Sequence, residues 1–514
     1  MSRLLVIQGD SQYELHATEN EILLDVLRRN ELSVSAPCGG NGTCGKCLVT
    51  IEDTDGNRSQ VLSCQFPVCD DLRVILEEQS GGAICTDSSD FAPTVNAGRS
   101  GYGAAVDLGT TTVALNLFDL SDGRKVGSAS GWNRQAPYGA DVITRTQYCM
   151  EHPDGLTRLS TLIRTQIRIL LEDACKISSI DICNVKEIYL AGNTIMEHLL
   201  FGLSPATIAV SPFTPQSLFD DGKLLALDHI PLFPAPCVAG YVGGDITAGL
   251  LACNLQNKPG RSLFLDIGTN GEMALSTPDG FLCCAVASGP AFEGAGISCG
   301  MTSTSGAISA VRWDGNAPVL TVIGDGIPKG ICGSGLLDLL AMLLDLGIVD
   351  ESGYLQPPDD LDQTFAPWLD EDEDGNGIFY LTRDRSIYFT ARDVRAIQLA
   401  KAAVAAGISV LLEESGLALA DIDALYLAGG FGSHLNPDSA VVIGMLPEVL
   451  RNKIVSIGNA SLTGASMALL DPANRTALLN IQRSCTYLEL SGHAGFNRLF
   501  PEHMTFDKED SPWK

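Results

Sequence analysis

The sequence predicts a multidomain protein in which a small α+β unit precedes a larger α/β unit. Three observations support this class. The chain has 514 residues, whereas one hydrophobic core rarely grows beyond about 250 to 300 residues. The first eighty residues contain a glycine-rich loop with three cysteines. Two later segments share one design, an apolar strand that ends in Asp-x-Gly-Thr. We therefore expect these features to lie in separate units.

Charge and composition exclude several classes of partner. Lys and Arg number 33 against 62 Asp and Glu, which gives a formal net charge of −29 at pH 7. Such a surface repels phosphate backbones and anionic lipid, so we expect no nucleic-acid partner and no membrane partner. We find no run of about 18 apolar residues and no signal peptide pattern, which predicts a cytoplasmic location. The 16 cysteines are then not expected to form a disulfide scaffold, because that compartment is reducing.

The first unit begins with strand and helix patterns. Residues 4–10 and 13–17 predict a short hairpin, and residues 19–30 carry apolar side chains at helical spacing. Residues 47–53 and 72–76 supply two further strands. Strands around one helix make a compact α+β unit.

The glycine-rich loop carries the most specific motif of this unit. Its cysteines follow the spacing Cys38-x5-Cys44-x2-Cys47, and Cys64 is the fourth candidate. Three thiolates in a compact loop, with one more from a neighbouring segment, suit an iron–sulfur cluster held by four thiolates. Zinc ribbons favour two CxxC pairs, and this loop has one. The pattern favours iron, with Cys69 as the competitor for the fourth position.

The same loop also contains the glycine spacing of a dinucleotide-binding turn, Gly40-x-Gly42-x-x-Gly45. A dinucleotide loop follows a strand and opens a helix. Here the predicted helix precedes the loop and a strand follows it. We interpret the glycines, together with Gly39, as positions where a loop around a cluster needs unusual backbone angles.

After the first unit, residues 81–101 are rich in Gly, Ser, Asp and Pro and show no apolar period. This composition predicts a flexible linker.

The two Asp-x-Gly-Thr segments predict a nucleotide site. Asp107 ends one apolar strand and Asp266 ends the other. A carboxylate in this position can hold Mg²⁺, and the following backbone N–H and hydroxyl groups can bind phosphate oxygens. Because the two turns lie about one domain apart, we expect two related halves that face each other. The residues of the two turns are Gly109, Thr110 and Thr111 in the first, and Gly268, Thr269 and Asn270 in the second.

Further segments complete this pattern. Residues 424–435 predict a buried strand that runs into Gly429 and Gly430, where the backbone can approach a flat ligand such as adenosine. Residues 241–253 and 457–470 predict helices with small residues, which permit close contact at a hinge. Glu272 either orients an attacking water or forms a surface ion pair. The stretch 330–335, Gly-Ile-Cys-Gly-Ser-Gly, is either an anion-binding turn or a tight helix start.

These motifs resemble two known families. The first unit, residues 1–80, resembles 2Fe–2S ferredoxins of the β-grasp fold, and residues 81–101 form the linker. The order of turns, helices and glycine pair resembles the phosphate-1, connect-1, phosphate-2, adenosine and connect-2 series of the actin, hexokinase and heat-shock (ASKHA) ATPases. That resemblance implies two RNase H-like halves that close over Mg-ATP, residues 102–258 and residues 259–514 with a C-terminal tail.

A ferredoxin followed by an ASKHA ATPase resembles the reductive activators of corrinoid proteins. The stretches 133–145, 191–200, 287–301, 330–340 and 487–500 also fit that family. The resemblance implies an ATP-hydrolysing activase that passes a low-potential electron from a 2Fe–2S cluster to Co(II) cobalamin, restoring Co(I) for methyl transfer in anaerobic metabolism. It implies a corrinoid protein and an upstream electron donor as partners, and it leaves monomer and homodimer open.

The resemblance also implies residue roles. Cys38, Cys44, Cys47 and Cys64 hold the cluster. Asp107 and Asp266 position Mg²⁺, with Glu272 as the third catalytic candidate. The nucleotide contacts are Gly109, Thr110, Thr111, Gly268, Thr269, Asn270, Gly429, Gly430 and Phe431. Three other functions stay open from the sequence: an activator of a dehydratase, a metabolite kinase with an electron-transfer appendage, and a redox-sensing module switched by nucleotide.

Overall fold

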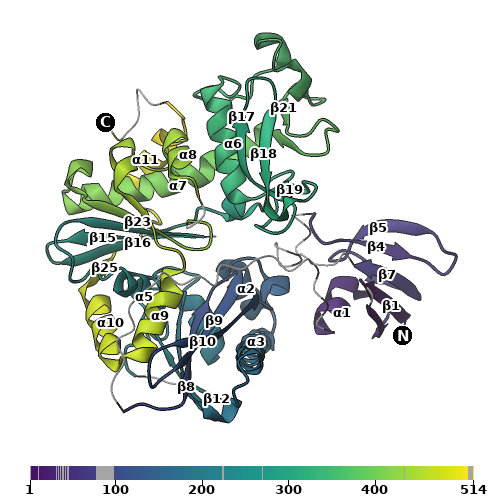
Figure 1. Ribbon diagram of the computed structural model, residues 1–514. Coiled ribbons are helices and arrows are strands. Elements are labelled where there is room, and N and C mark those ends of the chain that lie inside the picture. Colours follow the sequence, from purple (N-terminus) through teal and green to yellow (C-terminus); the bar gives the residue numbers. More distant parts are fainter. Residues whose placement is uncertain are drawn as a thin grey trace.

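The computed structural model describes residues 2–9, 11–30, 32, 34, 36, 40, 42, 45–76, 98–222, 225–268, 270–432, 435–507 and 513. Figure 1 shows the N-terminal unit in purple beside two larger bodies, a lower one that contains the blue strands and an upper one drawn mainly in teal and green. Cys38, Cys44 and Thr269 lie outside the described residues, as do Gly39 and most of the predicted linker.

The N-terminal unit is a five-stranded sheet of order β2-β1-β7-β4-β5. Its central pair, β1 and β7, is parallel, and the other pairs are antiparallel. Helix α1 (Leu23–Arg29) packs Leu23, Leu24 and Leu27 into the core of this unit. The expected hairpin and helix are therefore confirmed. The strands are β1 (Ser2–Gln8), β2 (Ser11–Ala17), β4 (Leu48–Glu52), β5 (Arg58–Leu62) and β7 (Leu72–Leu76), with a small pair β3 (Glu21–Ile22) and β6 (Pro67–Val68).

The second body contains a six-stranded sheet of order β10-β9-β8-β11-β13-β12. Strands β8, β9 and β10 form an antiparallel meander, and β11 and β13 continue the sheet in parallel. Helix α3 (Gly155–Ile177) covers one face, because its apolar side chains recur at helical spacing. The strands are β8 (Tyr102–Leu108), β9 (Thr112–Asp119), β10 (Lys125–Trp132), β11 (Val185–Gly192), β12 (Leu225–Leu227) and β13 (Ile230–Pro234), and the other helices are α2 (Val142–Glu151), α4 (Thr194–Phe201) and α5 (Gly244–Ala252).

The third body repeats this topology. Its main sheet has the order β24-β23-β14-β15-β16-β25, so a meander of β14, β15 and β16 is again extended by two parallel strands, β23 and β24. The shared order confirms the two related halves of the expected fold class. The strands are β14 (Ser262–Ile267), β15 (Gly271–Thr277), β16 (Gly280–Val286), β23 (Ala424–Ala428), β24 (Ile454–Ser456) and β25 (Cys485–Tyr487).

Two small sheets and the remaining helices complete this body. Helix α7 is the one described helix that is long and apolar enough to span a membrane, and 83% of its apolar window is buried in the structure. It packs on β16 and α11, so it is a core helix of this body. The remaining elements are β17 (Ala307–Trp313), β18 (Pro318–Val322), β19 (Gly330–Ile331), β20 (Leu369–Glu371), β21 (Gly377–Tyr380), β22 (Tyr388–Thr390), α6 (Gly333–Asp345), α7 (Ala391–Ser415), α8 (Pro437–Val442), α9 (Ala460–Leu470), α10 (Pro472–Ser484) and α11 (Ala494–Glu502).

Helices α5 and α9 join the two sheets. Helix α9 packs on β8 and β11 of the first sheet although it follows the second sheet in sequence. A Cβ added at Gly464 of α9 would lie 2.0 Å from the carbonyl oxygen of Ala248 in α5, so the two helices touch through their backbones. One apolar cluster includes Phe118 of the first sheet and Phe264 of the second, together with both helices. The expected close helix contact is confirmed, and it lies between the sheets.

Candidate functional site

The two predicted aspartates stand at equivalent places in the two sheets. Asp107 is the penultimate residue of β8, and Asp266 is the penultimate residue of β14. Each pairs with an alanine at the end of a parallel neighbour, Ala191 of β11 and Ala428 of β23. Both side chains are half-buried, so a ligand can still reach them.

Asp107 is fixed by the start of helix α9. Its Oδ2 accepts a hydrogen bond from Asn459 Nδ2 at 2.8 Å, and its Oδ1 accepts one from Ser461 Oγ at 2.7 Å. Asn459 also caps the helix, because its side chain accepts from the N–H of Leu462. Burial raises the pKa of Asp107, and these two bonds lower it in part. The position of α9 is thereby tied to the first carboxylate.

A third carboxylate, Asp245, joins the pair from the first turn of α5. Burial, followed by the charge of Asp107, raises the pKa of Asp245 to about 7. Burial, followed by the charges of Asp245 and Asp107, raises the pKa of Asp266 to about 8. The three acids therefore lie close enough to repel one another. A divalent cation relieves such repulsion, and carboxylate oxygens are its preferred ligands. The residues present fit Mg²⁺.

Glu272 is buried at 7% exposure, so its interpretation as a surface ion pair is wrong. Its Oε1 accepts a hydrogen bond from Asn193 Nδ2 at 3.3 Å, and its carboxylate also accepts one from the Asn270 side chain. Burial, then the charges of Asp245 and Asp266, raise the pKa of Glu272. Glu272 thus belongs to the same electrostatic cluster as the three aspartates.

The first phosphate turn is held from behind by residues 133–145. Asn133 donates from Nδ2 to the carbonyl of Gly109 at 2.9 Å, and its N–H donates to the carbonyl of Thr111 at 2.9 Å. The buried Arg145 donates from Nη2 to the carbonyl of Thr110 at 2.6 Å. The backbone carbonyl oxygens of all three turn residues therefore accept hydrogen bonds from this segment. The hydroxyl of Thr111 donates to the carboxylate of Glu293, at 3.3 and 3.4 Å from its two oxygens.

The second turn is described except at Thr269. The N–H of Gly268 donates to the carbonyl of Asn270 at 2.9 Å, and Ser288 Oγ donates to the carbonyl of Gly268 at 3.4 Å. This turn therefore starts from the same strand end as Asp266 and is closed by its own backbone bond.

The glycine pair after β23 lies against the second aspartate. Gly429 has φ = 89°, and a Cβ there would lie 2.4 Å from Asp266 Oδ1, so only glycine permits this approach. A Cβ at Gly430 would meet no atom within 4 Å. The ring of Phe431 stacks on Phe292 with centroids 5.0 Å apart and an interplanar angle of 3°. Phe431 is half-buried, and Gly333 makes room for its ring.

The stretch 330–335 starts helix α6, which begins at Gly333 after the buried Cys332. A Cβ at Gly333 would collide with the carbonyl of Phe292, and one at Gly335 would collide with that of Ile308. Of the two alternatives for this stretch, the tight helix start accounts for both glycines.

The cysteine loop is described at two of its four expected ligands. Cys47 Sγ and Cys64 Sγ lie 3.2 Å apart, and Cys47 is buried. Cys69 is exposed, and its Sγ contacts Asn20 and the carbonyl of Pro67 instead. This geometry favours Cys64 over Cys69 as the fourth cluster ligand, beside the three cysteines of the loop.

The glycines of the loop have left-handed backbones, with φ of 106° at Gly40, 74° at Gly42 and 67° at Gly45. The loop follows α1 and precedes β4, which is the reverse of a dinucleotide-binding turn.

Several site residues were not predicted from the sequence. Asp245 and Asn193 lie in stretches that we had recognised as part of the pattern, residues 241–253 and 191–200, but neither was singled out. An acid in the first turn of a small-residue helix is the signal that points to Asp245. Asn459 and Ser461 reach Asp107 across more than 350 positions of sequence, which no local pattern indicates.

Comparison with known protein families covers nearly the whole chain. Residues 6–69 match the 2Fe-2S iron-sulfur cluster binding domain. Residues 102–258 match the RACo middle region, and residues 260–514 match the C-terminal domain of RACo, the ASKHA domain.

Individual relatives agree with these matches. The corrinoid activation enzyme RamQ of Eubacterium limosum is 29% identical over 96% of this chain and 97% of its own length. A Methanosarcina barkeri protein, the reductase of a Co(II) methylated amine-specific corrinoid protein, is 24% identical over 80% of this chain and 78% of its own. The solved structure of a reductive activator for a corrinoid, iron-sulfur protein is 30% identical, covers 100% of both chains and has a TM-score of 0.72. The chain therefore belongs to the family of reductive activators of corrinoid proteins, with an N-terminal 2Fe–2S ferredoxin domain and a C-terminal ASKHA domain.

Proposed function

We propose that this protein uses ATP to pass a low-potential electron from its 2Fe–2S cluster to the Co(II) centre of a corrinoid protein, which restores Co(I) for methyl transfer. One observation carries the proposal. The same chain combines the paired thiols of Cys47 and Cys64 with the carboxylate cluster of Asp107, Asp245 and Asp266. Its membership in the activator family supports the same activity.

We assign Cys38, Cys44, Cys47 and Cys64 as the cluster ligands. The 3.2 Å approach of Cys47 and Cys64 and the left-handed glycines of the loop support this set. When bound, the cluster supplies a one-electron carrier of low potential. The chain provides the thiolates, and the buried position of Cys47 keeps water from at least one of them.

We assign Asp107 and Asp266 to Mg²⁺, which neutralises phosphate charge when it is bound. The raised pKa of Asp266 supports this assignment, since the neighbouring carboxylates that repel it gain from a cation between them. The expected nucleotide contacts remain part of the proposal. They are Gly109, Thr110, Thr111, Gly268, Thr269 and Asn270 at the phosphates, and Gly429, Gly430 and Phe431 at adenosine.

We further assign Asp245 as the general base of ATP hydrolysis. A base works best when its pKa lies near the working pH, and that of Asp245 is about 7. Glu272 holds the side chains of Asn193 and Asn270 in place through hydrogen bonds. Direct contact between Glu272 and the attacking water stays a prediction.

The need for ATP follows from the energy of the electron transfer. Each 59 mV uphill in a one-electron step is a factor of ten, so a gap of about a quarter volt costs roughly 6 kcal/mol. Hydrolysis supplies such an amount when it is coupled to closure of the two halves. A low-potential donor upstream and a corrinoid protein downstream complete the proposed reaction, and a homodimer is compatible with it.

The test is to mix the reduced protein with a Co(II) corrinoid protein and follow the absorbance of Co(I) with and without ATP. We expect Co(I) to form in the presence of ATP and to stay near background in its absence. Equal Co(I) formation in both samples, or none with several corrinoid proteins, would contradict the proposal.

A further inference from the structure

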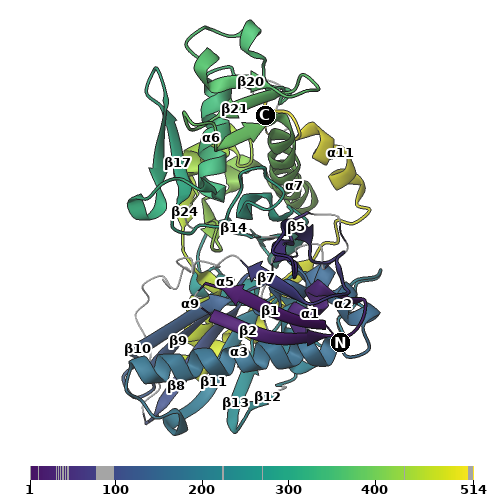
Figure 2. The ribbon, with the colours of Figure 1, turned by 90° about the vertical axis from the view of Figure 1, so that its right-hand side faces the viewer.

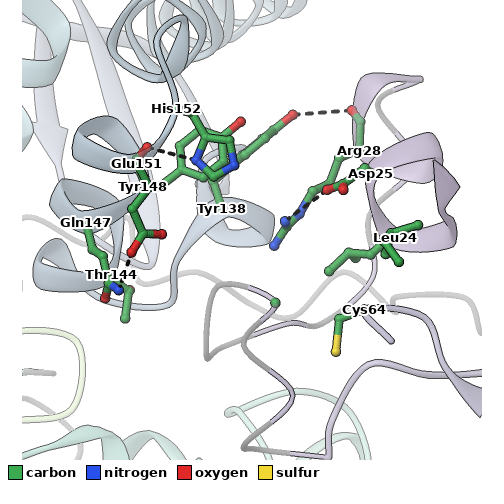
Figure 3. Close-up of a pocket in the computed structure, with 12 residues that line it drawn as sticks. Leu24, Asp25, Arg28, Cys64, Tyr138, Thr144, Gln147, Tyr148, Glu151 and His152 are labelled. Atoms are coloured by element: carbon green, nitrogen blue, oxygen red, sulfur yellow. Dashed lines mark hydrogen bonds and ion pairs between the residues drawn. The ribbon is translucent and has the colours of Figure 1, made fainter. Parts of the chain in front are cut away.

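Arg28 of α1 joins the ferredoxin unit to the second body. Arg28 donates to the carbonyl of Pro137, and its guanidinium lies 5.4 Å from the centre of the Tyr138 ring. The hydroxyl of Tyr138 donates in return to the carbonyl of Arg28 at 3.3 Å. The Arg28 side chain is only 6% exposed. Figure 3 shows Arg28 reaching from α1 toward the ring of Tyr138.

The same side chain borders the cluster loop. A Cβ at Gly40 would lie 3.4 Å from Arg28 Nη1. Cys64 and Arg28 line a cavity of about 260 Å³ whose opposite wall is formed by Tyr148 and His152 of the second body. In Figure 2 this N-terminal unit lies beside α2. Cys64 therefore lies on the side of the ferredoxin unit that faces the second body.

The segment that receives Arg28 also holds the first phosphate turn. Residues 133–145 include Pro137 and Tyr138, which contact the ferredoxin unit, and Asn133 and Arg145, which bind the carbonyls of residues 109–111. Arg145 Nε also donates to the carbonyl of Gly139 at 2.9 Å, directly after the Arg28 contact. One short segment thus connects Arg28 of the ferredoxin unit to the first phosphate turn.

A phosphate at this turn would disturb the arrangement. The Thr111 hydroxyl donates to Glu293 of the other half, and phosphate oxygens compete for the same hydroxyl. A phosphate also repels the Glu293 carboxylate. Because the carbonyl of Thr111 is bonded to Asn133, a shift of Thr111 is transmitted to residues 133–145.

We propose that residues 133–145 are a docking surface for the chain's own ferredoxin unit, which nucleotide binding releases through the first phosphate turn. The proposal rests on the proposed nucleotide site. Burial of the Arg28 guanidinium costs free energy, which Asp25 of the same helix and Pro137 and Tyr138 of the second body offset in this position, so a shift of Pro137 weakens the docked arrangement. Release frees the side of the ferredoxin unit that carries Cys64 for a partner protein. Coupling of two binding events is reciprocal, so loss of docking must tighten nucleotide binding.

The affinity of the full-length protein for a non-hydrolysable ATP analogue with Mg²⁺, measured by calorimetry, tests this coupling. We expect Arg28→Ala to bind the analogue about 5-fold more tightly or better. Tyr138→Phe should bind it about 3-fold more tightly, because one hydrogen bond is lost. Arg29→Ala is the matched control, since among the described residues Arg29 bonds to Glu21 and His16, both within the ferredoxin unit. Its affinity should equal that of the unmodified protein.

Hydrogen exchange on the same samples gives an independent readout. We expect the amides of α1 and α2 to exchange faster when the analogue binds to the unmodified protein, and already without it in Arg28→Ala. Unchanged or weaker affinity in both variants, or unchanged exchange on saturation, would overturn the coupling while leaving the proposed function intact. Absence of nucleotide binding to the unmodified protein would overturn both. If Arg28→Ala loses the visible absorbance of its cluster, its ferredoxin unit is damaged, and the affinity of Tyr138→Phe for the analogue then decides whether the coupling exists.

Discussion

Asp245 is the residue on which the proposed hydrolysis depends most. It lies in the first turn of α5, half-buried, and its neighbourhood contains Asp107 and Asp266. Burial, helped by the charge of Asp107, brings its pKa to about 7, so both protonation states are populated at neutral pH. Perturbed acids that gather in this way are typical of catalytic sites.

Asp245→Asn should abolish this base while preserving side-chain size. We expect ATP hydrolysis to fall by about 10²-fold or more and nucleotide affinity to change little. In the unmodified protein a base must be ionised to act, so the rate should rise with pH through about 7 and level off above it. Phosphate release measured from pH 5.5 to 8.5 checks both points. A variant with normal activity, or a profile flat across pH 7, would refute the role.

Cys64 and Cys69 can be separated by single substitutions. We expect Cys64→Ser to lose most of its iron and its visible absorbance, because its Sγ lies 3.2 Å from Cys47 Sγ. Cys69→Ser should keep both, since Cys69 is exposed and contacts Asn20. Iron content and the EPR signal after reduction give the answer. The reverse pattern would assign the fourth ligand to Cys69.

At the scale of single residues, the sequence alone identifies a site residue when its motif is made of neighbours in the chain. Asp107 and Asp266 each end an apolar strand before a Gly-Thr pair, so their neighbours in the chain identify them. Asn459 and Ser461 can be recognised as site residues only in the structure, where α9 packs on β8 and both side chains bond to Asp107. Gly429 was expected to face a ligand, whereas its close neighbour in the structure is the Asp266 carboxylate.

At the scale of elements, the contact of α5 with α9 decides how the two sheets are held. The two helices meet through small residues, because Gly464 of α9 lies on the backbone of Ala248 in α5. Each helix also carries a site residue at its start, Asp245 in the first turn of α5 and Asn459 as the N-cap of α9. Movement of one helix against the other would therefore move the carboxylates.

Gly464→Ala tests this contact, because the contact decides whether the substitution raises or lowers the free energy of unfolding. In an open helix the change would stabilise by about 1 kcal/mol, because alanine is the better helix former. Here the new Cβ would lie 2.0 Å from a backbone oxygen, so we expect destabilisation by about 1 to 3 kcal/mol. Thermal unfolding measures the difference. Gly326→Ala, at an exposed loop position with free space, is the control and should leave the midpoint unchanged. A more stable Gly464→Ala protein would contradict the packing.

The strands and helices themselves were largely predictable, because apolar runs and helical spacing are local. The hairpin and helix of the first unit and the strands that lead to both aspartates appear as expected. The position of α9 was not predictable, since it follows the second sheet in sequence but packs on the first. Helix packing across halves depends on shape complementarity that no single segment encodes.

At the scale of the whole molecule, one chain combines a unit for electron transfer with a unit for nucleotide binding in the proposed function. The ferredoxin unit provides thiolates for an electron carrier, and the two related halves provide carboxylates for a nucleotide. The shared strand order of the halves was expected from their repeated turns. The contact of Arg28 with Pro137 was not, because it joins residues that are separated by the linker.

The central claim is that ATP hydrolysis drives electron transfer from the 2Fe–2S cluster to the Co(II) centre of a corrinoid protein. The most direct measurement is the rate of Co(I) formation, followed by absorbance, when reduced protein is mixed with a Co(II) corrinoid protein and ATP. It should be made with the unmodified chain and with Asp245→Asn, each loaded with the same amount of cluster. We predict rapid Co(I) formation with the first and at least about 10²-fold slower formation with the second, its cluster staying reduced. Equal rates for the two proteins would contradict the claim.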